Sequence, residues 1–291
     1  MSQADRMLAQ VKSLPTMSLT VVRLSKMIDD ERSGAADMER VISPDPALTS
    51  NLLRLANSPY FGLTRKVESV RQAVTVMGTK RLFEIVAGAG FQSTIPKVIP
   101  GYETTSTRFW LHSVAVAALS ESLARELRLH PPDYTFTAGL LHDIGKLVIG
   151  AYLAAQPEDE RPDLMVTEGT LLDREREVFE TDHCELGAAL AERWNLPKRL
   201  QAVARWHHDT EGYTASEHRT LVDLVHAGNG LAHTLGYGSD IGEMSREVKD
   251  AVIARLKITT DRLERVASET FEKIVELGQV FTGESGLPGS S

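Results

Sequence analysis

The sequence predicts an all-α protein, and three observations favour that fold class. Nearly every segment repeats its apolar residues at a spacing of three or four, which is the period of a helix with one buried face. Alternating apolar and polar residues, which would indicate a half-buried strand, are nearly absent. Prolines, glycines and capping residues divide the periodic segments into pieces of ordinary helical length.

Helices are expected in the N-terminal part wherever a capping residue precedes a periodic run. The run over 18–28 is expected to face the core with Leu19, Val22, Leu24 and Met27. Asp45 is placed to cap the next long helix, which ends at Ala56 and has Pro46 at its first position. Further helices are expected over 37–42, 69–77 and 79–91, with breaks at 43–46, 57–62 and Gly78.

A boundary is expected at 96–101, where Pro96, Pro100 and Gly101 interrupt the helical pattern. The predicted parts are an N-terminal helical lobe over 1–98, a second helical lobe over 102–282 and a disordered tail over 283–291. In the second lobe one helix is expected to begin after an N-cap at Asp133 and to end near Leu153. The others are expected over 104–127, 164–180, 183–194, 197–207, 217–235, 245–256 and 260–281.

Composition and charge exclude several function classes. The 291 residues contain 32 Lys plus Arg against 40 Asp plus Glu, and this net charge of −8 argues against general binding to nucleic-acid phosphates. Cys184 is the only cysteine, which rules out an intrachain disulfide and a zinc cluster built from several thiolates. No apolar run reaches membrane-spanning length and the first residues do not resemble a secretory signal, so a soluble cytoplasmic protein is expected.

The segment 138–146 places His142 and Asp143 side by side within an apolar helix. An ionised carboxylate is costly there unless a cation or strong donors meet it. His112 lies on the apolar face of its own helix, and the ends of two further helices carry His183, His207 and His208. A bundle could bring these side chains to one point. Imidazole and carboxylate suit a divalent metal, Fe, Mn, Ni or Zn, and one or two ions are expected.

Each of these residues also has a purely structural interpretation. His112 alone would be a core histidine bonded to a backbone carbonyl. His207 and His208 would be a solvated helix end, where positive rings complement the helix dipole. Lys146 would extend its ammonium group to solvent along an apolar surface. The metal hypothesis therefore depends on the whole set rather than on any one member.

The order of these motifs resembles the HD superfamily of metal-dependent phosphohydrolases, and especially its HD-GYP branch. The residues concerned are His112, His142-Asp143-x-Gly-Lys146, His183 and His207-His208. Further motifs resemble the HDOD domain more closely: Leu14-Pro15, ISPDPALTSNLLRLANSPYFG over 42–62, SVRQAVTVMG over 69–78, AGLLHDIG over 138–145 and WNLP over 194–197. This resemblance covers roughly 14–235 and implies an N-terminal helical lobe together with an HD-type helical bundle.

The resemblance also implies roles for individual residues. The positions that match metal ligands of the HD-GYP phosphodiesterases are His112, His142, Asp143, His183, His207 and His208. Lys146 matches a lysine that those enzymes place near substrate phosphate. Asn229 stands where the family has its last aspartate, and it is a further candidate ligand that lacks the charge. The GYP loop is missing, since 208–214 is shorter and ends in Thr214.

Two functions follow from the resemblance. The first is a bacterial signalling and regulatory module that acts through contacts with a signalling protein and holds a metal centre. The sequence shows no receiver, kinase or cyclase segment, so output is expected through contacts or oligomerisation. The alternative is a phosphohydrolase of cyclic dinucleotides or nucleotides, in which Asp143 and the metal serve catalysis and Lys146 contacts phosphate. Neither a membrane nor a nucleic acid is an expected partner.

Overall fold

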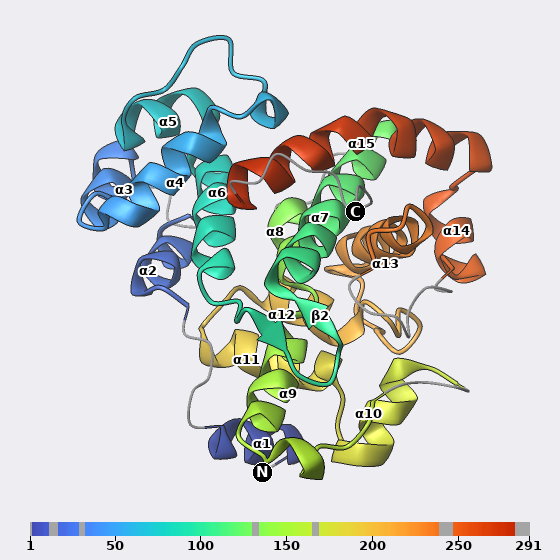
Figure 1. Ribbon diagram of the computed structural model, residues 1–291. Coiled ribbons are helices and arrows are strands. Elements are labelled where there is room, and N and C mark those ends of the chain that lie inside the picture. Colours follow the sequence, from blue (N-terminus) through green and yellow to red (C-terminus); the bar gives the residue numbers. More distant parts are fainter. Residues whose placement is uncertain are drawn as a thin grey trace. The chain divides into compact units, whose positions relative to one another are not determined.

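Helices dominate the computed structural model, which describes residues 2–11, 17–28, 33–129, 134–164, 169–238 and 247–282 (Figure 1). Within those ranges the only strands are β1 (Val98–Ile99) and β2 (Thr104–Thr105), which pair antiparallel. The predicted all-α class is confirmed. No helix in this described part of the chain is long and apolar enough to cross a membrane.

The chain divides into two compact units. One comprises Met1–Pro15 with Ile95–Thr270 and carries the histidine cluster, so we call it the histidine unit; the other, the small unit, comprises Thr16–Thr94 with Phe271–Ser291. The two units differ from the predicted lobes at both ends of the chain, because the first residues belong to the histidine unit and the last ones to the small unit. Helix α1 (Gln3–Gln10), which the sequence did not predict, contacts helices α9 and α11 of the histidine unit. The predicted tail over 283–291 lies outside the described residues, as do Leu14, Pro15 and Asp133.

The small unit is built from short helices whose bounds follow the predicted breaks. They are α2 (Leu19–Met27), α3 (Ala35–Ile42), α4 (Pro46–Ala56), the 3-10 turn η1 (Pro59–Phe61), α5 (Val70–Met77) and α6 (Thr79–Gln92). The predicted cap of α4 is confirmed, since the Asp45 carboxylate accepts the Leu48 N–H at 2.9 Å. The predicted apolar stripe of α2 is partly wrong. Leu24 is buried as predicted, but Leu19 is 73% exposed, and Val21 faces the core, which was not predicted.

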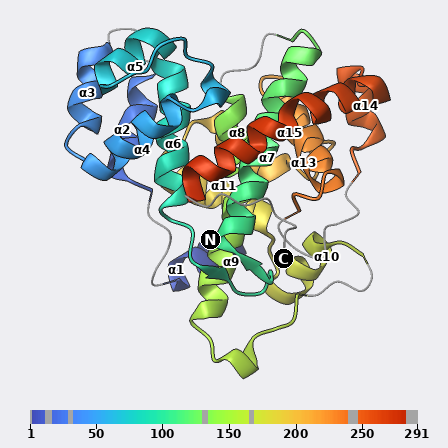
Figure 2. The ribbon, with the colours of Figure 1, turned by 45° about the horizontal axis from the view of Figure 1, so that its top comes forward.

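The histidine unit is organised around α7 (Ser106–Glu126), which is buried on almost every side. It packs against α8 (Thr135–Leu141) and α13 (Arg219–Thr234), and α13 lies beside it in both views (Figures 1 and 2). Helix α11 (His183–Arg193) packs against α9 (Ile144–Ala154) and α12 (Lys198–Trp206). The remaining helices are η2 (Glu158–Glu160), α10 (Leu171–Phe179), α14 (Asp250–Leu256) and α15 (Thr260–Thr282), whose last part extends past residue 270.

The single helix predicted around His142 is wrong, because the chain turns at His142 and Asp143 between α8 and α9. Two glycines show why the two helices take separate directions. A Cβ at Gly139 would lie 2.5 Å from the Ala117 Cα, so α8 approaches the α7 backbone at van der Waals contact. A Cβ at Gly145 would overlap the carbonyl oxygen of His183, so α9 approaches α11 equally closely. The turn is thereby held between α7 and α11.

The expected helix over 164–180 needs correction. Helix α10 begins only at Leu171, because Thr170 is its N-cap. The Thr170 hydroxyl accepts the Asp173 N–H at 3.2 Å, and the Asp173 carboxylate accepts the Thr170 N–H, which together form a capping box. The expected linker contains β1 and turns at Gly101, whose φ of +86° suits glycine.

Candidate metal centre

The structure brings together the six side chains that the sequence singled out. They come from four places in the histidine unit: α7 carries His112, the turn between α8 and α9 carries His142 and Asp143, α11 begins with His183, and His207 and His208 follow α12. All except His208 are at most 1% exposed, and His208 is 8% exposed. The interpretation of His207 and His208 as a solvated helix end is therefore wrong.

The Asp143 carboxylate lies at the centre of the cluster. Its Oδ1 is 3.4 Å from Nε2 of His183 and 3.3 Å from Nε2 of His207. Its Oδ2 is 3.4 Å from Nε2 of His142 and 3.7 Å from Nε2 of His112. Neither oxygen has a hydrogen bond of acceptable geometry, although both are buried. The carboxylate therefore stands between two pairs of imidazole rings.

The outer nitrogen of each of these four rings is held by a group that only accepts hydrogen bonds. The Nδ1–H of His112 donates to Tyr237 O at 2.9 Å, and that of His142 donates to Gly139 O at 2.7 Å. The Nδ1–H of His183 donates to the Glu175 carboxylate at 2.8 Å. The Nδ1–H of His207 is shared between Val203 O and Ala204 O, both at 3.1 Å. In a neutral ring this places the lone pair on Nε2, facing Asp143. Histidines that bind metals are held in the same way, by a carbonyl or carboxylate on the outer nitrogen.

The two sides of the carboxylate differ in charge. On the Oδ2 side, burial holds the pKa of His112 well below its ordinary value and lowers that of His142, which favours neutral rings. On the Oδ1 side, burial also opposes protonation, but Cys184 and Asp143 outweigh it and raise the pKa of His207 to about 9. Glu175 and Cys184 likewise raise the pKa of His183 well above its ordinary value. The Oδ1 side attracts positive charge, and a divalent ion would compete there with protons.

Lys146 is completely buried, and its Nζ lies 2.9 Å from Oδ2 of Asp143. The alternative in which its ammonium group reaches solvent is therefore wrong. Burial alone would raise the pKa of Asp143, but His142 and Lys146 hold it well below the usual range, so the carboxylate is ionised. Its contact with substrate phosphate stays a prediction.

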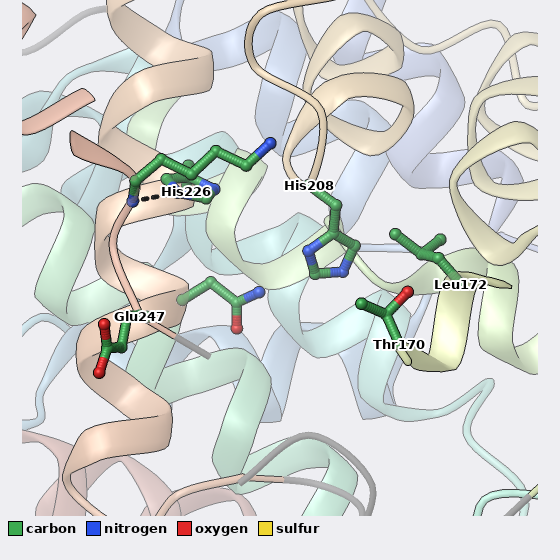
Figure 3. Close-up of a pocket in the computed structure, with 8 residues that line it drawn as sticks. Thr170, Leu172, His208, His226 and Glu247 are labelled. Atoms are coloured by element: carbon green, nitrogen blue, oxygen red, sulfur yellow. Dashed lines mark hydrogen bonds between the residues drawn. The ribbon is translucent and has the colours of Figure 1, made fainter. Parts of the chain in front are cut away.

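A cavity of about 230 Å³ reaches the cluster at His208 (Figure 3). The His208 ring centroid lies 4.0 Å from that of His207 and 5.2 Å from that of His183. Asn229 also lines the cavity; it is 2% exposed and its Oδ1 is buried without a hydrogen bond. The other lining residues are Thr170, Leu172, His226, Gly230, Glu247 and Lys249.

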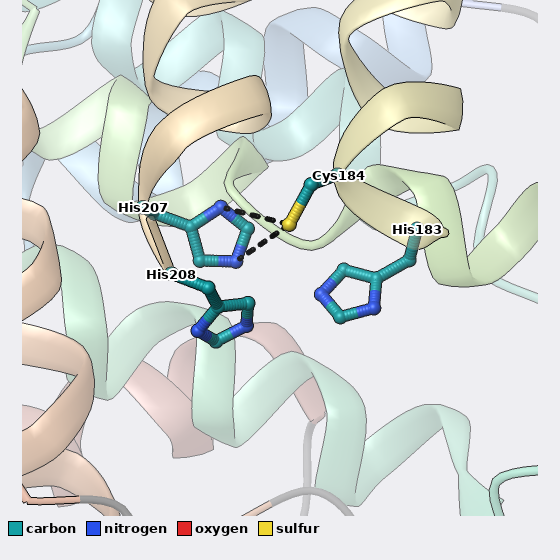
Figure 4. A group of neighbouring side chains, drawn as sticks. All are labelled: His183, Cys184, His207 and His208. Atoms are coloured by element: carbon teal, nitrogen blue, oxygen red, sulfur yellow. Dashed lines mark hydrogen bonds between the residues drawn. The ribbon is translucent and has the colours of Figure 1, made fainter. Parts of the chain in front are cut away.

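Sequence reasoning missed two residues of the cluster. Glu175 is completely buried, its carboxylate bonds His183, and it accepts the Tyr102 hydroxyl at 2.7 Å. Its spacing from Leu171 and Phe179, both buried, places it on the apolar face of α10, and this signal was available in the sequence. The Cys184 Sγ lies 3.9 Å from Nδ1 of His207 (Figure 4). Burial raises the pKa of the Cys184 thiol, but His207 and His183 outweigh this effect and lower it.

Two groups of these side chains could hold a metal ion. One comprises His112, His142 and Asp143, and the other His183, Cys184, His207 and His208. Within each group the possible ligand atoms lie within 4.8 Å of one another. Besides these, His226 donates its Nδ1–H to the His207 carbonyl at 2.7 Å, and the His233 ring lies 5.0 Å from the His112 ring.

The HDOD domain family model matches residues 14–210 of the chain. A curated relative, an uncharacterized protein of Treponema pallidum (strain Nichols), is 24% identical over 292 residues. That alignment covers 96% of this chain and 52% of the relative, so the chain spans about half the length of the relative.

Three solved structures share the fold. An HDOD domain protein with unknown function from Geobacter sulfurreducens has a TM-score of 0.72 at 24% identity, with 98% of both chains covered. A candidate phosphohydrolase from Shewanella amazonensis SB2B has a TM-score of 0.68 at 22% identity, with 95% of this chain and 98% of that chain covered. A candidate signal transduction protein from Marinobacter aquaeolei VT8 has a TM-score of 0.70 at 17% identity, with 96% of this chain and 65% of that chain covered. These likenesses show the fold alone.

Proposed function

The chain belongs to the HDOD domain family, and we propose that it is a bacterial signalling module whose histidine unit binds a divalent metal ion. One observation carries the metal site: four imidazole Nε2 atoms surround the Asp143 carboxylate at 3.3 to 3.7 Å. The outer nitrogens of the four rings are already bonded, so the inner Nε2 atoms face Asp143 before any ion arrives, and an ion on the Oδ1 side would replace the ring protons there. Lys146 already pairs with Oδ2 of Asp143 at 2.9 Å, but the buried Oδ1 has no hydrogen bond, and a cation on that side would offset the cost of its burial.

The ligands divide according to the two carboxylate oxygens. On the Oδ2 side, His112 and His142 would hold one ion together with Asp143. On the Oδ1 side, His183 and His207 would hold another, with His208 at the edge that meets the cavity. Imidazole and carboxylate suit Fe, Mn, Ni or Zn. A bound ion of this kind would neutralise the carboxylate and acidify a water molecule attached to it.

Burial favours a regulatory role over a catalytic one. The four histidines on the carboxylate are completely buried, and the Lys146 ammonium is paired with Asp143 instead of facing an open site. The cavity at His208, about 230 Å³, is smaller than the roughly 300 Å³ at which ligand pockets usually begin. We therefore propose that the metal stabilises the fold and that the module acts through contacts with a signalling protein. A protein of the same fold from Marinobacter aquaeolei is a candidate signal transduction protein, in keeping with this role.

The metal proposal is tested on purified protein by elemental analysis and by thermal shifts. Chelator-treated wild type should gain melting temperature when Mn, Fe, Ni or Zn is added. The double variant His142→Ala, Asp143→Ala should hold less metal and lose that gain, whereas His218→Ala, outside the cluster, should behave like wild type. Metal-free wild type without any shift would overturn the proposal.

The second candidate function is metal-dependent phosphohydrolysis of nucleotides or cyclic dinucleotides. The cavity favours it, because His208 and Lys249 line the same space and offer an imidazole and an ammonium group to a phosphate. Turnover of cyclic di-GMP and of an aryl phosphodiester, with Mn or Fe supplied, tests this function directly. Brisk turnover by wild type would rank the enzyme above the regulator.

A further inference from the structure

Cys184 lies in the first turn of α11, directly after His183, and is 2% exposed. Its Sγ is 3.9 Å from Nδ1 and 4.0 Å from Nε2 of His207. Figure 4 shows its sulfur and the rings of His183, His207 and His208 around one common space. The sulfur therefore belongs to the same group of possible ligand atoms as these three histidines.

A second observation points independently to a ligand at this place. The Nε2 atom of His183 is buried, makes no hydrogen bond, lies 3.4 Å from Oδ1 of Asp143 and faces the same space (Figure 4). The ring cannot easily turn away, because the Glu175 carboxylate holds its Nδ1 at 2.8 Å. An oriented and buried nitrogen of this kind is costly unless a proton or a metal ion meets it.

We propose that Cys184 is a metal ligand and that, with His183, His207 and His208, it forms a thiolate-containing site for Zn²⁺ or a similarly thiophilic divalent ion. This inference rests on the proposed function, because it adds a sulfur ligand to the Oδ1 side of the same cluster. Binding converts the thiol to a metal thiolate, and the thiol proton leaves to solvent.

The chemistry of sulfur gives the site its selectivity. Thiolate and imidazole together suit Zn²⁺, whereas Mn²⁺ prefers oxygen ligands. Zinc–sulfur and zinc–nitrogen bonds of about 2.3 and 2.0 Å place tetrahedral ligands roughly 3.5 Å apart. The four ligand atoms lie within 4.8 Å of one another, so no pair needs to draw together by more than about 1.3 Å.

The experiment uses Co²⁺ as a spectroscopic substitute for Zn²⁺ in the full chain. Chelator-treated wild type is titrated with Co²⁺, and the near-ultraviolet charge-transfer band of a cobalt thiolate is recorded. The variants are Cys184→Ser, Cys184→Ala and, as a control outside the cluster, His218→Ala. We expect the band in wild type and in His218→Ala, and its loss in both Cys184 variants. Their Zn²⁺ affinity should fall at least about tenfold, the loss that even outer-sphere partners cause when removed, while their Mn²⁺ affinity stays unchanged.

The outcomes separate this inference from the proposed function. If wild type binds Co²⁺ without a thiolate band, Cys184 is a small apolar residue that packs against His207, and only the inference fails. If wild type binds neither Co²⁺ nor Zn²⁺, the metal proposal fails together with it. The wild-type spectrum decides the matter even if a Cys184 variant folds poorly.

Discussion

Glu175 holds His183 at two points, since Oε2 accepts the backbone N–H at 2.7 Å and the carboxylate accepts Nδ1–H at 2.8 Å. Tyr102 donates its hydroxyl to Oε1 of the same carboxylate at 2.7 Å. Both Glu175 and His183 are completely buried. The pair therefore fixes the start of α11 and aims Nε2 of His183 at Asp143.

Glu175→Gln should weaken metal binding without removing any proposed ligand. The amide cannot supply the charge that makes His183 a strong ligand, so metal affinity should fall by about 10- to 100-fold. Isothermal titration with Zn²⁺ or Mn²⁺ measures this loss. The matched control is Glu177→Gln, which changes an exposed carboxylate paired with Arg174 on the same helix. Equal affinities of both variants and wild type would show that Glu175 serves the fold only.

Asp143 and Lys146 should be coupled in the chelator-treated protein. Asp143→Asn leaves the buried ammonium without its ion pair and should lower the free energy of unfolding by about 3 to 5 kcal/mol. Adding Lys146→Met removes the stranded charge, so the double variant should be more stable than Asp143→Asn alone. Urea unfolding of both single variants and the double variant gives the coupling energy. If the stability loss of the double variant equalled the sum of the two single losses, Asp143 and Lys146 would not be coupled.

His226 should make the stability of the protein depend on pH below neutrality. Burial lowers its pKa from 6.5 to about 4. The hydrogen bond to the His207 carbonyl acts in the opposite direction, and the Lys249 charge lowers the pKa further. Its Nε2 accepts the Lys249 N–H at 3.1 Å and is unprotonated in the folded protein. The unfolded chain therefore binds more protons between pH 6.5 and 4. The stabilisation is complete above pH 6.5 and is lost as the pH falls toward 4, by up to about 3 kcal/mol.

The comparison with His226→Gln isolates this contribution from that of the other histidines. Glutamine can donate to the His207 carbonyl and accept from the Lys249 N–H, but it does not titrate. As the pH falls from 6.5 to 4, wild type should lose stability relative to the variant, so the unfolding free energy of wild type minus that of the variant should fall. A difference that stays constant over this window would mean that His226 does not titrate with a lowered pKa.

The sequence predicted which segments are helical better than it predicted where the chain turns. Periodicity and caps marked most helices, because those signals are local. The turn at His142 and Asp143 has apolar residues on both sides and no local break signal; it depends on the contacts of Gly139 and Gly145 with other helices. Helix α1 did carry a local signal, since Ser2 and Asp5 form a capping box that the prediction overlooked.

For the candidate site, the sequence identified the residues that share inward positions but not those that support them. His112 and Asp143 stood out because burial of polar groups needs a reason. Glu175 was hidden in a charged stretch, although its helical spacing was informative. Cys184 was set aside because one sulfur cannot build a cluster of thiolates. That reasoning does not exclude a single thiolate among histidines. The closeness of Cys184 to His207 depends on the packing of α11 against α12, which the sequence does not show.

Asn229 provides the last prediction, because its side chain is buried beside the cluster without a partner for Oδ1. It lines the same cavity as His208. An amide cannot neutralise two nearby cations, so a second ion should bind more weakly than it would next to a carboxylate. Asn229→Asp should therefore be less stable than wild type after chelation, since it buries a charge. Added metal should stabilise the variant by more than it stabilises wild type.

Asn229→Asp should also raise metal stoichiometry and, with it, any phosphodiesterase activity, because two-metal sites divide water activation and phosphate binding between their ions. The measurements are metal content per chain and turnover of cyclic di-GMP and an aryl phosphodiester with Mn or Fe supplied. Asn195→Asp, at an exposed position, controls for the added charge. If wild type already turned over briskly and Asn229→Asp changed nothing, the regulatory proposal would yield to the enzymatic one. If the variant bound a second ion yet hydrolysed nothing, substrate recognition would be the missing element, and the shortened loop after His208 would be its first candidate.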